Sequence, residues 1–401
     1  MVDVTIDYSH KPSAMISRRE FLSAALVAPA AFSQRSDDRF LSTVPLGNTR
    51  STPGTPLERL LGGGLNARLF TNLSTIAKDN PQSHVISTER FFVRTAAPQS
   101  LPETIDSSQW TIDVGGLVES PSHISVAALD ALGTRSGRFL LECSGNTDPA
   151  NYGLLSTADW DGVPLAAVLE RLKPSARAWR VLVSGLDDAA DPAGTSVPGA
   201  SWIFSRDDLQ RALLATRMNG APLPRNHGSP ARLIVPGWYG CACIKWVNRI
   251  ELVPDEAPAT SQMREFAART HQPFDTLRAG TPAPLARDFT PAIIDTAAMP
   301  VRVEKWAARG GRIFYRIAGI MWGGSKPTDQ LSIRFRSNLP WTRVEDCPRP
   351  SSTDTWSLWT HTWQPESPGR YTIVLRADDP SIRTRRLDLF FYARDIDIDD
   401  I

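Results

Sequence analysis

The stretch FLLECSGN, residues 139–146, ends an apolar run at a cysteine and continues into a Ser-Gly-Asn turn. The run RFLLEC predicts a buried strand that delivers Cys143 to that turn. Four interpretations of the thiol follow: a buried core residue, half of a disulfide, a nucleophile or a metal ligand. For a lone cysteine on an apolar strand, the residues alone favour the core interpretation.

The other cysteines narrow these alternatives. Four cysteines among 401 residues are too few for a disulfide scaffold. Cys241 and Cys243 are one residue apart, which disfavours pairing with each other; a bond from either to Cys347 is a weaker alternative. No zinc-finger spacing is present. If Cys143 were a nucleophile, His227 would be its candidate base.

The composition excludes several classes of protein. With 44 basic and 43 acidic residues the net charge is +1, which gives no bulk field for nucleic acid or a membrane surface. No segment of the mature region reaches the roughly 20 apolar residues of a membrane span. The 32 prolines, 26 glycines and 12 tryptophans favour short strands, many turns and aromatic packing.

The N-terminus contains an export pattern. In SRREFLSAALVAPAAFS, residues 17–33, a twin arginine precedes about ten apolar or small residues and an A-x-A-like site. The stretch resembles a twin-arginine signal peptide, which we assign to residues 1–31. It predicts a periplasmic or extracytoplasmic protein and hints at a cofactor, because this route carries proteins already folded. Residues 32–84 are interpreted as a tail or linker.

Residues 85–258 mix strand and helix patterns without a regular βαβ rhythm, which predicts an α+β domain. Strands are expected over 90–95, 110–118, 138–143, 179–187, 232–237 and 243–253. Helices are expected in VAALDAL after Ser125, in DGVPLAAVLERL, and in DDLQRALL after Ser205.

Residues 259–292 form a Pro- and Ala-rich connector, and residues 293–396 then change in character. Five strand candidates follow one another there without a long helix: RIFYRIAGIMW, LSIRFRSNLPW, WSLWTHTW, RYTIVLRA and RRLDLFFYA. This spacing predicts an antiparallel sandwich of immunoglobulin type.

A second dense stretch, NHGSPARLIVPGWYGCACIKWVNRI, covers residues 226–250. It supplies His227, Arg232 and Lys245 around glycines that let the backbone approach a ligand. Convergence of these side chains would suit an anionic, phosphate-bearing cofactor. On spacing alone, solvated strand residues and a loop histidine are the better interpretation.

Taken together, ECSGN (142–146), WDGVPL (160–165) and SPARLIVPGWYG with IKWVNRIEL (229–252) closely resemble the sulfite oxidase family of molybdenum enzymes. The resemblance extends from about residue 85, and its C-terminal part looks like that family's dimerisation domain. It implies a Mo-molybdopterin cofactor with Cys143 as the direct molybdenum ligand. The cofactor-binding positions implied are Arg94, Thr95, Asp187, His227, Arg232, Cys243, Ile244 and Lys245. Arg94 is also implied to act in catalysis near the metal.

This chain departs from the family pattern around the implied substrate pocket. Thr95 and Ala96 stand where the family has Asn-His, and Thr147 and Asp148 stand where sulfite oxidases carry arginine soon after the cysteine turn. An ungapped alignment puts Phe266 at the family's tyrosine. An aspartate in place of an arginine would repel a dianion, so the cofactor site is expected to be retained and the sulfite pocket altered.

The resulting expectation is an exported oxidoreductase that transfers an oxygen atom to sulfite or a related small oxidisable substrate. With no haem-attachment motif in the chain, electrons would pass to an external partner such as a c-type cytochrome. A homodimer through the C-terminal domain is also implied. The alternatives are a reductase of S- or N-oxides at the same centre, a cofactor-free exported binding protein and, least favoured, a zinc hydrolase.

Overall fold

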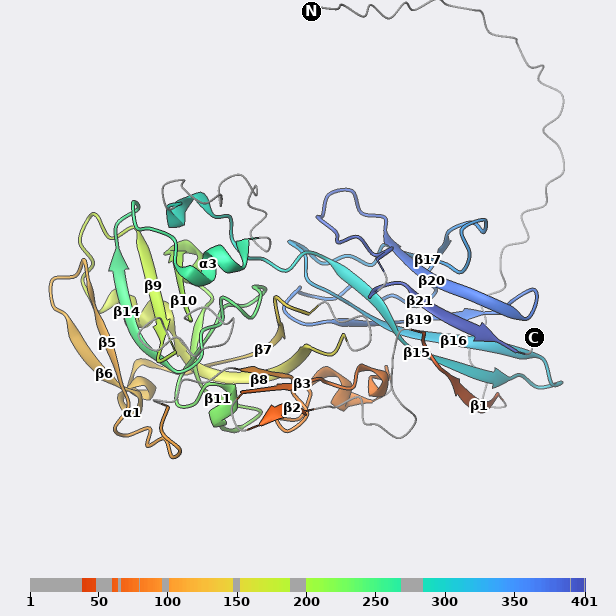
Figure 1. The fold of residues 1–401 in the computed structure, drawn as a ribbon, viewed down its shortest axis with the longest axis horizontal. Coiled ribbons are helices and arrows are strands. Elements are labelled where there is room, and N and C mark those ends of the chain that lie inside the picture. Colours follow the sequence, from red (N-terminus) through yellow and green to blue (C-terminus); the bar gives the residue numbers. More distant parts are fainter. Residues whose placement is uncertain are drawn as a thin grey trace, which may run out of the picture. The chain divides into compact units, whose positions relative to one another are not determined.

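The computed structural model describes a chain made mainly of strands (Figure 1). The described residues are 38–47, 60–63, 66–78, 80–95, 101–146, 152–187, 200–267, 284–389, 391–399 and 401. They belong to one unit, Ser36–Ile401. The predicted signal peptide and the positions Thr147 and Asp148 lie outside them.

The first large sheet has the strand order β10–β9–β14–β5–β6. Its only parallel pairing among the described strands is β14 with β5; the others are antiparallel. The bounds are β5 Thr111–Gly116, β6 Ser122–Ser125, β9 Arg180–Gly185, β10 Ser201–Ser205 and β14 Val247–Val253. β14 begins directly after Trp246, so this sheet fixes the chain just beyond Lys245.

The second sheet carries the cysteine strand and has the order β12–β11–β8–β7, with β13 paired to β11. The bounds are β7 Arg135–Glu142, β8 Leu155–Pro164, β11 Leu213–Met218, β12 Ala221–Pro222 and β13 Arg232–Ile234. A small third sheet joins β2 Leu60–Gly63, β3 Asn66–Leu69 and β4 Val93–Thr95. Cys143 therefore directly follows β7, Arg232 begins β13, and Arg94 lies in β4.

The C-terminal part contains two four-stranded antiparallel sheets, β1–β15–β16–β19 and β18–β17–β20–β21. The bounds of the first are β1 Arg39–Val44, β15 Ala297–Ala307, β16 Ile313–Trp322 and β19 Ser357–Trp363. Those of the second are β17 Leu331–Arg334, β18 Thr342–Arg343, β20 Gly369–Ala377 and β21 Arg394–Ile398. The strand-rich character expected after the connector is present.

Helices are few and short among the described residues: α1 Val126–Leu129, α2 Leu165–Glu170 and α3 Ser261–Glu265. The α+β prediction therefore overstates the helix content. The helix expected in DDLQRALL is wrong, because only a 3₁₀ turn, η4 (Asp207–Leu209), follows Ser205. Leu213 and Leu214 belong instead to β11, where they are fully buried between β8 and β13.

Two further predictions need correction. The segment 32–84, interpreted as a tail, contains β1, which pairs with β15, as well as β2 and β3. The strand expected in RRLDLFFYA is a turn region, and the final strand β21 begins at Arg394, just after it. The strand β15 was not predicted, because its alanines continued the composition of the connector.

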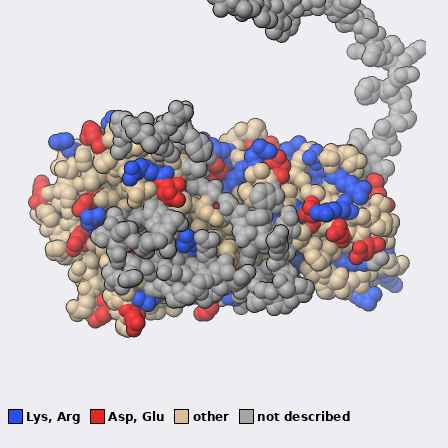
Figure 2. All heavy atoms as spheres, viewed as in Figure 1, with Lys and Arg blue, Asp and Glu red and all other residues tan. Residues whose placement is uncertain are grey.

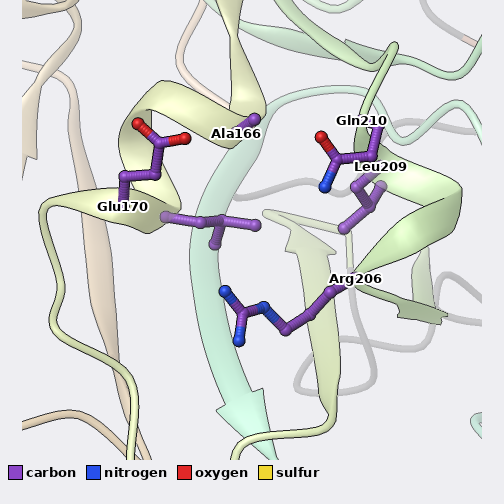
Figure 3. Close-up of a pocket in the computed structure, with 6 residues that line it drawn as sticks. Ala166, Glu170, Arg206, Leu209 and Gln210 are labelled. Atoms are coloured by element: carbon purple, nitrogen blue, oxygen red, sulfur yellow. The ribbon is translucent and has the colours of Figure 1, made fainter.

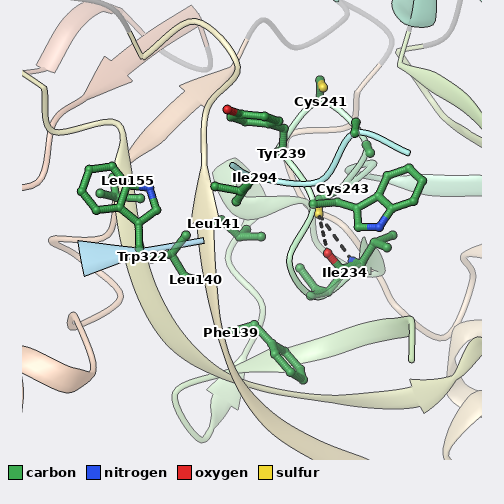
Figure 4. Close-up of a cluster of buried hydrophobic side chains, with 14 of the residues drawn as sticks. Phe139, Leu140, Leu141, Leu155, Ile234, Tyr239, Cys241, Cys243, Ile294 and Trp322 are labelled. Carbon is green, nitrogen blue, oxygen red and sulfur yellow. Dashed lines mark hydrogen bonds between the residues drawn. The ribbon is translucent and has the colours of Figure 1, made fainter. Parts of the chain in front are cut away.

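The core is rich in aromatic residues, as the composition indicated. The tryptophans with 2% or less of their surface exposed are Trp160, Trp202, Trp246, Trp322, Trp356 and Trp359. Figure 4 shows part of this core, with Leu140 and Leu141 of β7 among the buried side chains. Packing of this kind holds the end of β7 in place and so presents Cys143 in a fixed position.

Candidate active site

Cys143 lies in a turn that the backbone defines closely. Its N–H donates to Leu154 O at 3.0 Å, and its carbonyl accepts from Asn146 N at 3.0 Å. The Asn146 side chain completes the turn, since its Oδ1 accepts from Leu154 N at 3.2 Å. The Cys143 side chain is half-buried, so the thiol is held at the end of β7 without being sealed in the core.

The loop before β14 approaches this turn closely. Gly240 N donates to Glu142 O at 2.7 Å. A Cβ at Gly240 would lie 3.1 Å from that same carbonyl oxygen, which is tighter than an ordinary contact. A side chain at position 240 would crowd that carbonyl, and the PGWYG segment lies against the cysteine turn.

Lys245 joins the loop to two other segments. Its Nζ donates to Asn226 O at 2.8 Å and to Arg94 O at 3.2 Å. Gly228, at φ +109°, lies against it; a Cβ there would come within 2.9 Å of Lys245 Cβ. The lysine thus fixes the strand of Arg94 beside the loop of His227.

The charge environment of Lys245 shows which site residues are its neighbours. Burial, followed by the positive charge of Arg232, lowers the pKa of Lys245 well below its usual value. The negative charges of Asp187 and of a Cys143 thiolate act in the opposite direction, and Arg94 adds to the lowering. The structure therefore brings these predicted residues into one electrostatic group.

Arg232 is a buried cation, with 4% of its surface exposed. Its Nη1 donates to His227 O at 3.2 Å, and its guanidinium lies over the Trp160 ring at 5.6 Å. Its Nε is buried and has no hydrogen-bond partner among the described residues. Burial lowers the pKa of Arg232 to about 10, so it stays protonated at neutral pH.

His227 lies in the 3₁₀ turn η5 (Arg225–His227) and is 2% exposed. Its Nε2 donates to Thr88 O at 3.3 Å, and the Phe91 ring meets it edge-on at 5.5 Å. Burial, with the charges of Lys245 and Arg232, lowers the pKa of His227 to about 3. A histidine of such low pKa is a weak general base, which disfavours the interpretation of Cys143 as a nucleophile.

Asp187 follows β9, where Leu186 N donates to Trp246 O at 3.0 Å. Gly185 allows this approach, since a Cβ there would meet Lys245 O at 2.2 Å and Asp187 Oδ1 at 2.7 Å. The sequence after β9 therefore places the carboxylate next to the lysine.

The remaining predicted residues lie in the same loop or at its edge. Cys243 is buried, and its Sγ accepts from Val235 N at 3.5 Å (Figure 4); burial raises the pKa of this thiol. Its N–H donates to Gly240 O at 3.2 Å, and Ile244 O accepts from Leu233 N at 2.8 Å. Thr95 ends β4 beside Arg94. All four cysteines are free, so the disulfide alternative is wrong.

Phe266 lies at the C-terminal end of α3, where its N–H donates to Gln262 O at 3.0 Å. Its side chain is partly buried and packs against the core. Sequence reasoning missed Arg225, two residues before His227, whose buried Nε has no hydrogen-bond partner among the described residues. The sequence feature that could have indicated Arg225 is the presence of a second basic residue beside His227 in RNHG.

These contacts bear on the kind of ligand that the site can hold. Arg232 and Arg225 each retain a buried N–H that no described residue accepts, and the pKa of Lys245 is depressed in cationic surroundings. Buried donors and charges of this kind call for an anionic partner. A phosphate-bearing cofactor beside a half-buried thiol fits this set of donors.

Other features of the described residues give weaker indications of a ligand site. A pocket between α2 and η4 (Figure 3) is lined by Ala166, Leu169, Glu170, Arg206, Leu209 and Gln210 and contains none of the predicted site residues. No cluster of three or more His, Cys, Asp or Glu side chains suited to a metal occurs in the described part of the chain.

Basic and acidic side chains are interspersed on the face shown in Figure 2. Within the described ranges, no helix has the length and hydrophobicity of a membrane span.

Sequence comparison shows which known proteins this chain resembles. Residues 99–261 match the oxidoreductase molybdopterin binding domain. The chain is 28% identical to mitochondrial sulfite oxidase of Mus musculus over 68% of this chain and 50% of that protein. It is 31% identical to the protein-methionine-sulfoxide reductase catalytic subunit MsrP of Xanthomonas axonopodis pv. citri, over 41% of this chain and 51% of that one. The chain therefore spans about half the length of these relatives.

Among solved structures, the fold resembles the sulfane dehydrogenase SoxCD from Paracoccus pantotrophus. The TM-score is 0.60 at 16% sequence identity, and 96% of each chain is covered. At this identity the likeness concerns the fold, and it extends over nearly the entire chain.

Proposed function

Because this chain is a molybdopterin-dependent oxidoreductase of the sulfite oxidase family, we propose that it transfers an oxygen atom to sulfite or a related small oxidisable substrate. The electrons would pass to an external acceptor. The observation that carries the proposal is the half-buried Cys143 thiol near the buried cation Arg232 and the half-buried Lys245. When bound, Mo-molybdopterin supplies two-electron oxygen-atom transfer chemistry.

Cys143 is the residue that would bind molybdenum. A thiolate is a soft ligand, and one such ligand suffices for a metal that is otherwise held by its organic cofactor. The turn from Cys143 to Asn146 keeps the sulfur at the end of β7, so little conformational entropy is lost when the cofactor binds.

The cationic residues would hold the anionic and hydrogen-bonding groups of molybdopterin. Arg232 and Lys245 offer charge-assisted donors to the phosphate, and Arg232 Nε needs such an acceptor. His227 would act as a neutral hydrogen-bonding group, because its pKa is about 3. Asp187 would accept hydrogen bonds from the pterin, with backbone contacts from Thr95, Cys243 and Ile244.

Arg94 would orient the substrate, because a guanidinium recognises an anionic or oxo-bearing group through fixed donors. The alternative is reduction of S- or N-oxides at the same centre, which the similarity to a methionine-sulfoxide reductase subunit favours. Asp148 and Phe266, which stand where the family has arginine and tyrosine, indicate only that the sulfite pocket is altered.

A turnover assay separates the two directions. We expect the purified enzyme to oxidise sulfite with ferricyanide as acceptor and to leave methionine sulfoxide unreduced by a viologen donor. Arg94→Met should lower kcat/KM for sulfite by about 10- to 100-fold, since a hydrogen bond to a charged group contributes about 1.5–3 kcal/mol. Reduction of the sulfoxide without oxidation of sulfite would favour the reductase.

The setting of the enzyme is part of the same proposal. SRREFL and the apolar run after it support export by the twin-arginine route to the periplasm. An external electron partner such as a c-type cytochrome would accept the electrons. Residues 85–258 would form the molybdopterin domain, and residues 293–396 an immunoglobulin-like domain through which two chains dimerise.

A further inference from the structure

Glu142, the residue directly before Cys143, carries a buried carboxylate. Its side chain is 1% exposed and that of Arg385 is 9% exposed. Arg385 holds both oxygens: Nη1 donates to Oε1 at 2.7 Å and Nη2 to Oε2 at 2.6 Å. Trp322 Nε1 adds a hydrogen bond to Oε2 at 2.8 Å, and Tyr152 OH one to Oε1 at 3.0 Å. A carboxylate with four donors has one favourable position.

Arg385 is itself fixed by the segments around the cysteine. Its Nη1 lies 3.0 Å from Tyr152 Oη and 2.9 Å from Tyr392 Oη. Its guanidinium lies over the ring of Tyr239 at 5.3 Å and over that of Trp322 at 5.6 Å. Tyr239 precedes Gly240, whose N–H bonds to the Glu142 carbonyl. Arg385 therefore contacts the chain on both sides of the cysteine turn.

Tyr152 ties this network to the other end of the turn. Two residues after it, Leu154 accepts from Cys143 N and donates to Asn146 Oδ1. The segment 152–154 thus contacts Glu142 through the tyrosine hydroxyl and Cys143 through its backbone. A shift of Glu142 would disturb both contacts. Because a buried charge without its partner is costly, the ion pair resists such a shift.

We propose that Arg385, from the segment between β20 and β21, is a positioning residue for Cys143 and acts through the Glu142 carboxylate. The inference rests on the proposed function in one respect, since it takes Cys143 to be the molybdenum ligand. The C-terminal region then shapes the active site in addition to any role in dimerisation.

The test measures alkylation of Cys143 by iodoacetamide in the full chain, purified from a host that cannot make molybdopterin, with peptide mass spectrometry as readout. Cys347 in the same chain serves as internal reference. We expect Glu142→Gln and Arg385→Met each to speed alkylation of Cys143 by about tenfold, because both release the turn. A purely electrostatic effect would move the two variants in opposite directions, since they remove charges of opposite sign.

Further variants guard against simple misfolding. Arg385→Lys keeps the charge and should restore part of the wild-type rate, and Tyr392→Phe, which removes one hydroxyl, should give a smaller change in the same direction. Arg302→Met breaks a comparable partly buried ion pair with Glu304 on β15 and should leave the Cys143 rate unchanged. Wild-type rates in Glu142→Gln, Arg385→Met and Tyr392→Phe, or opposite shifts in the first two, would overturn the proposal.

A second arm uses the cofactor-loaded protein and follows the loss of molybdenum during dialysis. Arg385→Met should lose the metal faster than wild type, and Arg302→Met should not. Absence of molybdenum from the wild-type chain would overturn the proposed function, whereas unchanged alkylation would overturn the positioning role. The two failures are therefore distinguishable.

Discussion

Arg232 is a cation in the interior, and no carboxylate among the described residues forms an ion pair with it. It bonds to the carbonyl of His227 and lies over Trp160, and its Nε remains unsatisfied among the described residues. Burial of a charge in this way is expensive unless a ligand completes it. We therefore propose that Arg232 takes part in binding an anion.

Substitution of Arg232 tests this assignment. Arg232→Met should weaken retention of the cofactor by about 10- to 100-fold, because a hydrogen bond to a charged group contributes about 1.5–3 kcal/mol. Molybdenum and pterin content after dialysis are the measurements. Arg249→Met removes an exposed arginine of β14 and serves as the control. Equal retention in the two variants would contradict the assignment.

His227 predicts a pH dependence of stability. Its folded pKa, about 3, lies below the ordinary value of 6.5. Between pH 6.5 and pH 3, His227 is protonated in the unfolded chain but neutral in the folded protein. The free energy of unfolding therefore decreases as the pH falls from 6.5 towards 3. From pH 7 to pH 5 the histidine should account for a loss of about 2 kcal/mol.

Urea unfolding of the cofactor-free protein at pH 7 and pH 5 measures this loss. His227→Gln should lose about 2 kcal/mol less stability than wild type over the same interval, since carboxylates contribute equally to both. Equal losses in the two proteins would mean that the histidine is not buried in its neutral form.

At the scale of elements, the sheet that carries Cys143 depends on a close approach of two backbones. Gly162 of β8 faces β11; a Cβ there would lie 2.2 Å from Leu214 O and 2.5 Å from Ala215 Cα. Neither atom is the end of a flexible side chain. Gly162→Ala must therefore move one strand or the other.

We expect Gly162→Ala to lower the free energy of unfolding by about 3 kcal/mol. Gly115→Ala is the matched control, because a Cβ at Gly115 of β5 meets nothing within 4 Å. Its effect should stay within about 0.5 kcal/mol. Denaturant unfolding of both variants gives the comparison, and similar losses would refute the strand spacing described here.

Local sequence patterns predicted many of these elements but not all. The strands β5, β9 and β20 coincide with apolar runs bounded by turns. A pattern of this kind can be recognised from a few consecutive residues. DDLQRALL has good helix formers, yet Leu213 and Leu214 extend into β11 because pairing on both sides buries them. Tertiary contacts overrode the local preference there.

The residues of the site show the same division. His227, Arg232 and Lys245 lie close in sequence, and the family resemblance, rather than their spacing, implied that they bind a cofactor. In the structure the charges of Arg232 and of a Cys143 thiolate both act on Lys245. The contact of Glu142 with Arg385 joins residues 243 positions apart. Nothing local to either residue indicates its partner, so this ion pair could be found only in the structure.

In the folded protein, segments that are distant in sequence pair or bond with one another. β1 near the start of the described chain pairs with β15, and Arg385 near its end bonds to the residue before Cys143. Such pairings are beyond local patterns because their geometry depends on the assembled fold. The bond between Arg385 and Glu142 connects the C-terminal region to residues 99–261, which match the molybdopterin binding domain.

We propose that this fold holds Mo-molybdopterin through Cys143. Elemental analysis of the protein, purified from an exporting host supplied with molybdate, tests it most directly, beside Cys143→Ala. We expect about one molybdenum per chain in the wild type and markedly less in the variant. Wild-type protein that contains neither molybdenum nor pterin would contradict it.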